Sequence, residues 1–95
     1  MNIKDLIPKD QTVSVSKLFE SEKATVKVVQ ILQDAKLAEH ITKVPALLIC
    51  IIGNAVFENE WGIKETLLPG DYVKIEPMVK HWVIGIKASQ LLLFK

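Results

Sequence analysis

Short runs in which polar and apolar residues alternate fill almost the whole of this 95-residue chain. Alternation with a period of two places successive side chains on opposite faces of an extended strand, and no run has the period of a long amphipathic helix. Turn-forming residues, most clearly Pro69-Gly70-Asp71, separate the runs at intervals of roughly eight to twelve residues. Such spacing is typical of an all-β sandwich or barrel.

The pattern divides into separate elements. The first residues favour one helical turn, with Asn2 or Asp5 as its cap. Residues 16–22 fit either a short helix or a second extended piece, because Leu18 and Phe19 lie among charged residues. We predict strands over residues 12–15, 24–32, 37–42, 44–52, 55–60, 63–68, 72–76, 81–87 and 90–94.

The chain is long enough for one domain with a single modest core. We expect one barrel over residues 1–95, with residues 24–95 as its core. Residues 1–23 are expected to be an N-terminal segment that serves as an interface or an edge strand. Asp71 is expected to bond backbone N–H groups of its turn rather than to act as an acid or base.

Composition excludes several classes of function. The net charge is +1, and all 12 basic residues are lysine, so arginine clamps on phosphates or bases are unavailable. We therefore expect no nucleic-acid partner. No apolar run approaches the roughly twenty residues of a membrane-spanning helix. We expect no membrane partner and a cytoplasmic location, with the single cysteine, Cys50, acting as a small buried hydrophobe.

The run from residue 46 to 52 is apolar at both of its alternating sets of positions. A sheet with one solvated face would show polar residues in one of these sets. This strand is therefore predicted to be covered on both sides, and Leu91, Leu92 and Leu93 show the same character. The second cover is either the N-terminal segment or another subunit, and we favour a homodimer because monomers rarely expose large apolar patches.

Residues 38–83 resemble the cupin superfamily of small jelly-roll barrels. The resemblance rests on an apolar strand that ends at Gly53, a following hairpin, and the block Leu68-Pro69-Gly70-Asp71-Tyr72. This block continues as Val-x-Ile and is followed by His81, ten residues after Asp71. The resemblance implies an RmlC-like double-stranded β-helix, which agrees with the all-β prediction.

Cupins typically hold a metal with three histidines and one carboxylate, and the resemblance places this set on particular positions. His40 and His81 occupy two of the histidine positions, whereas Thr42 and Ala46 stand where the other histidine and the glutamate are expected. The metal motifs are thus degenerate, and a divalent transition metal would have His40 and His81 as its only matched ligands. Substitute ligands to consider are Cys50, Glu76, Glu58 and Glu39, although alternation puts Glu39 on the opposite face from His40.

The same comparison suggests a ligand pocket lined by His40, Thr42, Leu48, Phe57 and His81. Phe57 is expected to fill the barrel interior, and Trp82 to face away from His81.

The first functional hypothesis is a small-molecule-binding barrel without the full metal site. The alternatives are a metal-dependent enzyme of the dioxygenase or isomerase type with an altered ligand set, and a dimeric regulatory or scaffold module. No Ser-His-Asp set, Gly-rich phosphate loop or CxxC motif offers other catalytic machinery, so we expect no demonstrable enzymatic activity. The remaining alternative is that no site exists and that His40 and His81 are unrelated histidines, each satisfied by local hydrogen bonds.

Overall fold

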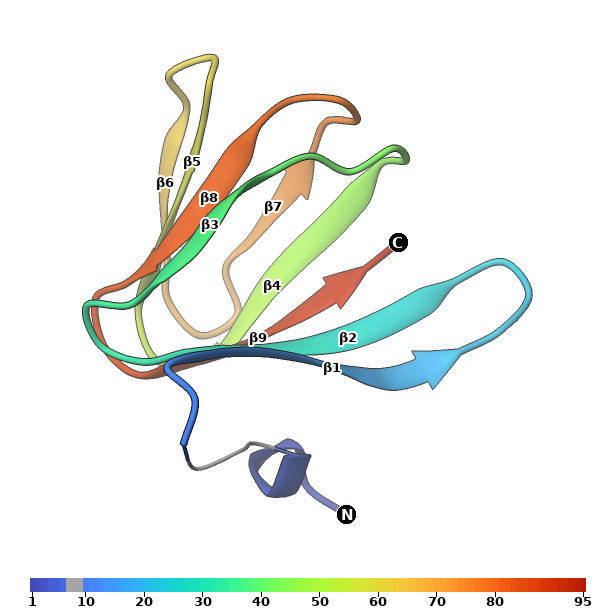
Figure 1. The fold of residues 1–95 in the computed structure, drawn as a ribbon, viewed down its shortest axis with the longest axis vertical. Coiled ribbons are helices and arrows are strands. Elements are labelled where there is room, and N and C mark those ends of the chain that lie inside the picture. The colour runs from blue at the N-terminus through green and yellow to red at the C-terminus, as the bar shows by residue number, and fades with distance from the viewer. Residues whose placement is uncertain (7–9) are drawn as a thin grey trace.

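Two antiparallel β-sheets face each other in the computed structural model, which describes residues 1–6 and 10–95. One sheet has five strands in the order β1-β2-β9-β4-β7, and the other has four in the order β3-β8-β5-β6 (Figure 1). The elements are η1 Ile3–Leu6, a single 3-10 turn, and the strands β1 Val13–Glu20, β2 Thr25–Ile31, β3 Lys36–His40, β4 Ala46–Ile52, β5 Ala55–Asn59, β6 Lys64–Leu67, β7 Tyr72–Ile75, β8 His81–Gly85 and β9 Ser89–Phe94. This arrangement confirms the prediction of an all-β jelly-roll barrel.

Local sequence signals account for several of these boundaries. Asn2 caps η1, since its side-chain Oδ1 accepts a hydrogen bond from the backbone N–H of Lys4 at 2.9 Å. Asp71 closes the turn before β7, because its Oδ2 accepts a bond from the N–H of Leu68 at 2.9 Å. Gly70 in that turn has φ of 91°, a conformation that favours glycine. Both the helical turn and the role of Asp71 are thus confirmed.

Residues 16–22, which the sequence left open, are extended as far as Glu20 in β1. β1 is the edge strand of the five-stranded sheet and pairs with β2 of the same chain. The register shifts between Lys17 and Phe19, so one extra residue lies in β1 at that point. This bulge explains why the alternation of β1 breaks down at Leu18 and Phe19.

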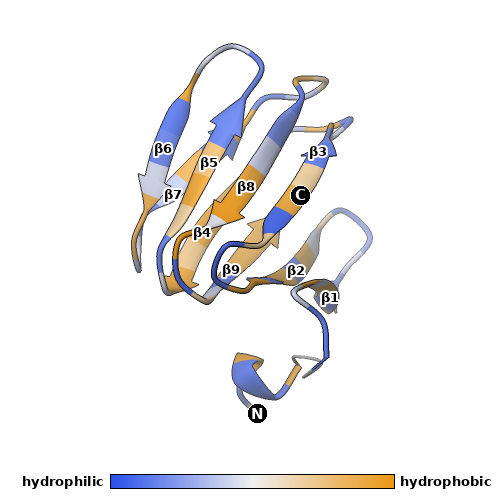
Figure 2. Ribbon diagram, turned by 60° about the vertical axis from the view of Figure 1, so that its left-hand side comes forward, coloured by the Kyte–Doolittle hydropathy of each residue, from blue (hydrophilic) through white to orange (hydrophobic). Residues whose placement is uncertain are grey.

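The core lies between the sheets, where apolar side chains from both meet. Figure 2 shows hydrophobic residues concentrated on β4, β5, β8 and β9, the inner strands of the two sheets. The largest side chains that are almost wholly buried include Phe57, Ile31, Leu67 and Leu91. Cys50 is fully buried in the same cluster, which confirms its role as a small hydrophobe. Burial, reinforced by the charge of Asp71, raises the pKa of its thiol.

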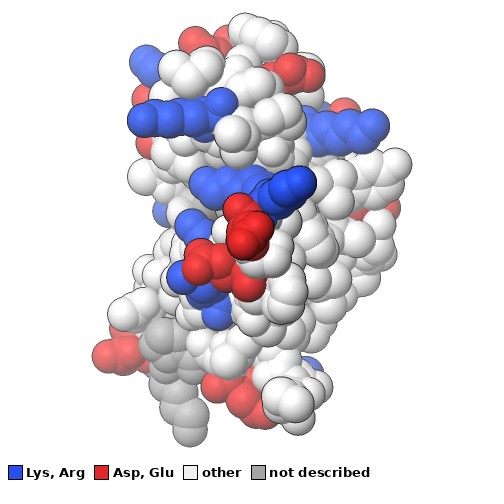
Figure 3. All heavy atoms as spheres, turned by 90° about the vertical axis from the view of Figure 1, so that its right-hand side faces the viewer, with Lys and Arg blue, Asp and Glu red and all other residues white. Residues whose placement is uncertain are grey.

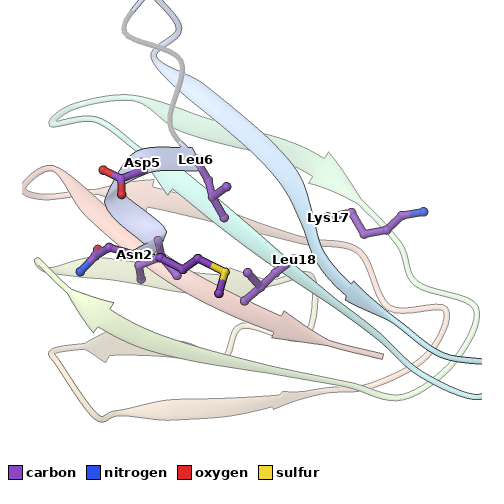
Figure 4. Close-up of a pocket in the computed structure, with 7 residues that line it drawn as sticks. Asn2, Asp5, Leu6, Lys17 and Leu18 are labelled. Carbon is purple, nitrogen blue, oxygen red and sulfur yellow. The ribbon is translucent and has the colours of Figure 1, made fainter.

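The outer face of the five-stranded sheet is also apolar. We call it the outer apolar face. Register places Phe19, Val28, Leu47, Ile49, Tyr72, Leu92 and Phe94 on this side of the sheet, and we add Leu18, which lines the pocket beside η1. Part of it is covered by η1, where Gln90 Nε2 donates to the carbonyl of Ile3 at 3.5 Å. A pocket of about 440 Å³ separates η1 from β1, and Leu6 and Leu18 point into it (Figure 4).

Elsewhere this face is open, since Phe19 and Tyr72 are each 59% exposed. The two-sided apolar character read from residues 46–52 therefore has a structural counterpart, because Ile49 is half-buried on the outer side while Leu48 and Cys50 are buried in the core.

Within the described residues, no helix is both long and apolar enough to cross a membrane.

Candidate functional site

His40 and His81 meet at the junction of β3 and β8. The register of the two strands sets the residues directly opposite each other, and their ring centroids are 4.1 Å apart in an edge-to-face arrangement at 61°. His81 is 2% exposed and stacks at 5.6 Å on the ring of Phe57. The two histidines are therefore in contact, although 40 residues of sequence lie between them.

A β-bulge in β3 controls how His40 is presented. The register shifts between Leu37 and His40, so these two residues both pair with inward-facing residues of β8 although they are three positions apart. The bulge interrupts the simple alternation from which Glu39 was predicted to lie on the face opposite His40. Glu39 is exposed, yet it lines the same pocket as His40.

Backbone carbonyls fix the two imidazole rings through the same nitrogen. His40 Nδ1 lies 2.9 Å from the carbonyl oxygen of Ala38, and His81 Nδ1 lies 3.2 Å from that of Val79. With Nδ1 donating these bonds, a neutral ring would carry no proton on Nε2. Each ring is thus oriented to accept a hydrogen bond, or to bind a cation, through Nε2.

The surroundings of His81 favour its neutral form. Burial lowers the pKa of His81, and electrostatic interactions with His40 and Lys95 lower it further, while the bond to Val79 acts in the opposite direction. The imidazole is consequently neutral at pH 7, where it can accept a hydrogen bond but carries no charge.

A pocket of about 370 Å³ opens beside the histidines at one end of the barrel. β2 and β3 are joined at the left of Figure 1 and spread apart toward the right, and the pocket lies between residues of these strands, β1 and β9. It is lined by Val15, Lys27, Val29, Leu37, Ala38, Glu39, His40, Leu93 and Lys95. We call it the mouth pocket. Its size is at the lower end of the range of small-molecule sites.

The residues expected to form the site are only partly brought together. His40 lines the mouth pocket, His81 contacts its ring, and Phe57 lies behind His81 in the core. Leu48 is buried in the core cluster and is not among the lining residues. Thr42 is buried in the loop after β3, where its hydroxyl donates to the carbonyl of Val44 at 2.8 Å.

The donor set does not match the metal site that the resemblance implied. The described residues contain no group of three or more His, Cys, Asp or Glu side chains arranged to hold a metal ion. Ala46 is part of the apolar core, and Cys50 is buried there as well. Glu58 lies on the outward side of β5, opposite Trp82 and away from the histidines, and its Oε2 accepts a bond from Trp82 Nε1 at 3.0 Å. Trp82 precedes the buried Val83 and points away from His81, as the alternation predicts.

Sequence reasoning missed most of the pocket wall. Lys27 and Lys95 line the pocket together with the apolar residues Val15, Leu37 and Leu93. Alternation along β2 puts Lys27 and Val28 on opposite faces of the strand, but it does not tell which face points into the barrel.

Comparison with solved structures identifies the architecture. No protein-family model matches the sequence, and no curated protein gives a significant match. A cupin superfamily protein from Desulfitobacterium hafniense superposes with a TM-score of 0.81 and 18% identity, over 94% of this chain and 80% of its own. A cupin-2 domain protein from Shewanella frigidimarina gives 0.81 at 17% identity, over 100% and 92% of the two chains. An RmlC-like cupin with a double-stranded β-helix from Methanocaldococcus jannaschii gives 0.78 at 18% identity, over 94% and 84%.

The chain has a cupin fold. At these identities the likeness shows the fold and not the activity, because cupin barrels support many unrelated functions. In this cupin barrel the histidine pair and the mouth pocket form the candidate site.

Proposed function

We propose that this cupin-fold protein binds a small molecule in the mouth pocket, with His40 on the pocket wall and His81 behind it. The observation that carries the proposal is the combination of apolar walls with an oriented imidazole. Val15, Val29 and Leu93 supply apolar surface, while His40 offers Nε2 as a hydrogen-bond acceptor. Small-molecule sites combine these features, an apolar lining with a few placed polar groups.

The test fills the pocket without disturbing the core. Val15 lines the pocket from the edge strand and is 47% exposed, so Val15→Trp would add a large ring to the mouth. Val44, which is 49% exposed and is not a lining residue, provides the matched control Val44→Trp. Fragments with an apolar ring and one polar group are screened by amide chemical shifts of the ¹⁵N-labelled protein. We expect binders to shift Leu37, His40 and Leu93, and to lose affinity in Val15→Trp but not in Val44→Trp. Binders that keep their affinity in Val15→Trp, or that shift only η1, would contradict the proposal.

The alternative is a metal-dependent enzyme with an altered ligand set. It is favoured by one observation, the shared orientation of both imidazoles, in which a carbonyl holds Nδ1 and Nε2 is left for a ligand. Two neutral nitrogen ligands hold a transition metal weakly, so the binding function is preferred. Metal content of protein grown with Mn, Fe, Ni and Zn and never exposed to a chelating resin decides between them. Near-stoichiometric metal that is absent from His40→Ala would favour the enzyme.

We further propose that two copies associate through the outer apolar face, which would also suit a regulatory or scaffold role. The support is the apolar character of β4 and β9 on both sides and the exposure of Phe19 and Tyr72 beyond the area that η1 covers. Ile49→Lys places a charge on this face and is expected to give monomers by analytical ultracentrifugation. The control Ile63→Lys changes an exposed residue outside the face. A dimer that persists in Ile49→Lys would contradict this placement of the interface.

The single buried cysteine supports a proposal of cytoplasmic location.

Charged side chains give no reason to add a nucleic-acid role. On the face shown in Figure 3, lysines and acidic residues lie close together and do not form a broad patch of one sign. A nucleic-acid surface would be expected to concentrate positive charge there.

A further inference from the structure

Two lysines line the mouth pocket at the open end of the barrel, Lys27 partly exposed and Lys95 exposed. Lys27 pairs with Leu93 in the ladder between β2 and β9, and Leu93 packs against the core, so Lys27 belongs to the same inward-facing row as Val29 and Ile31. Lys95 follows β9 and bonds through its backbone to Thr25, which sets its position beside Lys27 at the open end of the barrel. Both residues line the mouth pocket.

Neither lysine has a carboxylate partner among the described residues. The ion pairs found there are Lys17 with Glu20 at 3.1 Å and Lys64 with Glu58 at 4.0 Å. Glu39 also lines the mouth pocket, but it forms no such pair with either lysine. Lys27 is only partly exposed, and it shares the wall of the mouth pocket with the apolar residues Val29 and Leu93.

We infer that the mouth pocket takes a small organic anion, a carboxylate on an apolar body, whose charge lies between Lys27 and Lys95. This inference rests on the proposed binding function and names the ligand class for the same pocket. The apolar body would contact Val15, Val29 and Leu93, which line the pocket beside the two lysines. His40 would accept a hydrogen bond from a donor on the ligand through Nε2, because its Nδ1 is engaged by the carbonyl of Ala38.

Electrostatics favours an anion over a neutral ligand of the same shape. An ammonium that faces apolar surroundings interacts more strongly with a carboxylate than an ammonium in bulk water does, because the local dielectric is lower. Lys95 and His40 line the same pocket, and the interaction of Lys95 with His81 contributes to the lowered pKa of that histidine. The alternative is that both lysines extend their ammonium groups into solvent and contribute only their aliphatic stems.

A matched pair of probes separates these two cases. Benzoate and benzamide have nearly the same shape and differ in charge, and each is titrated into the ¹⁵N-labelled protein while the amide shifts of Leu37 and Leu93 are followed. We expect benzoate to bind about tenfold more tightly than benzamide, with Lys27→Gln and Lys95→Gln each weakening benzoate about three- to tenfold. Benzamide affinity should stay unchanged in both variants. Lys27→Arg, which keeps the charge, should keep most of the benzoate affinity.

Lys87→Gln is the control, because Lys87 is exposed in the turn between β8 and β9, outside the pocket. Amide spectra establish that each variant is folded. If Lys27→Gln disturbs the barrel, Lys95→Gln still tests whether a pocket lysine contributes to benzoate binding. Equal affinity for benzoate and benzamide would overturn the anion inference and leave the binding function standing. Failure of both probes to shift Leu37 or Leu93 would overturn the binding function at this pocket, and the anion inference with it.

Discussion

Stability should fall in mild acid because His81 is buried in its neutral form. The pKa of His81 is lowered in the folded protein, mainly by burial, whereas an unfolded histidine titrates near about 6.5. Between the folded pKa and that value, the unfolded chain binds one more proton than the folded chain. The free energy of unfolding therefore decreases as pH falls through this window and is unaffected by this group at higher pH.

The size of the effect is limited by the single proton. For one group the slope cannot exceed about 1.4 kcal/mol per pH unit. His81 is 2% exposed and its ring lies 4.1 Å from that of His40, so a charge on His81 would be poorly solvated. We accordingly expect the free energy of unfolding to begin to fall as the pH drops below about 6.5, with a slope no larger than this maximum.

The measurement is urea unfolding followed by tryptophan fluorescence at constant ionic strength, between about pH 5 and pH 8. The wild type is compared with His81→Gln, which cannot titrate, so that contributions from carboxylates common to both proteins cancel. His40→Gln is the control that removes the partly exposed ring and leaves the buried one. Parallel pH profiles for the wild type and His81→Gln would refute the reasoning, as would a wild type that gains stability relative to His81→Gln on acidification.

Three further changes probe the barrel itself. Gly53→Ala should cost clearly more stability than Gly70→Ala in urea unfolding. Both glycines have positive φ, so an alanine at either position costs about 1–2 kcal/mol in backbone strain, but only at Gly53 would the new Cβ overlap the backbone of the β8–β9 turn. Equal losses of stability would contradict this. Phe57→Ala should destabilise by about 3–5 kcal/mol, and Phe94→Ala, at a partly exposed position, by much less; thermal midpoints that shift equally would show that Phe57 is not the larger core contact. Asp71→Ala should cost about 1 kcal/mol through the lost bond to Leu68, and an unchanged urea midpoint would argue against the cap.

Local signals made the fold predictable. Alternation, the Pro-Gly-Asp turn and the apolar β4 run depend on residues close in sequence, and each is reflected in the strands and turns of the structure. The open question at residues 16–22 has a physical cause. A bulge between Lys17 and Phe19 inserts an extra residue, and that shift is visible only once β2 is in place as a partner.

The site was predictable only in its histidines. Their positions came from resemblance to a family, whereas their contact depends on the register of β3 and β8. Lys27 shows the limit of pattern reading, because alternation states which residues share a face and not which face is inside. In β2 the row containing Val28 faces outward beneath the N-terminal region, and the row containing Lys27 faces the barrel interior.

The direct opposition of His40 and His81 makes their contact a reporter of how the chain has assembled. A slip of one residue between β3 and β8 would turn one ring to the outer surface and separate the pair. Because this pairing joins distant parts of the sequence, it is expected to form late, after local hairpins such as β5–β6. Misassembled barrels would retain the hairpins and lack the ring contact, so the imidazole proton resonances can distinguish them from the native fold.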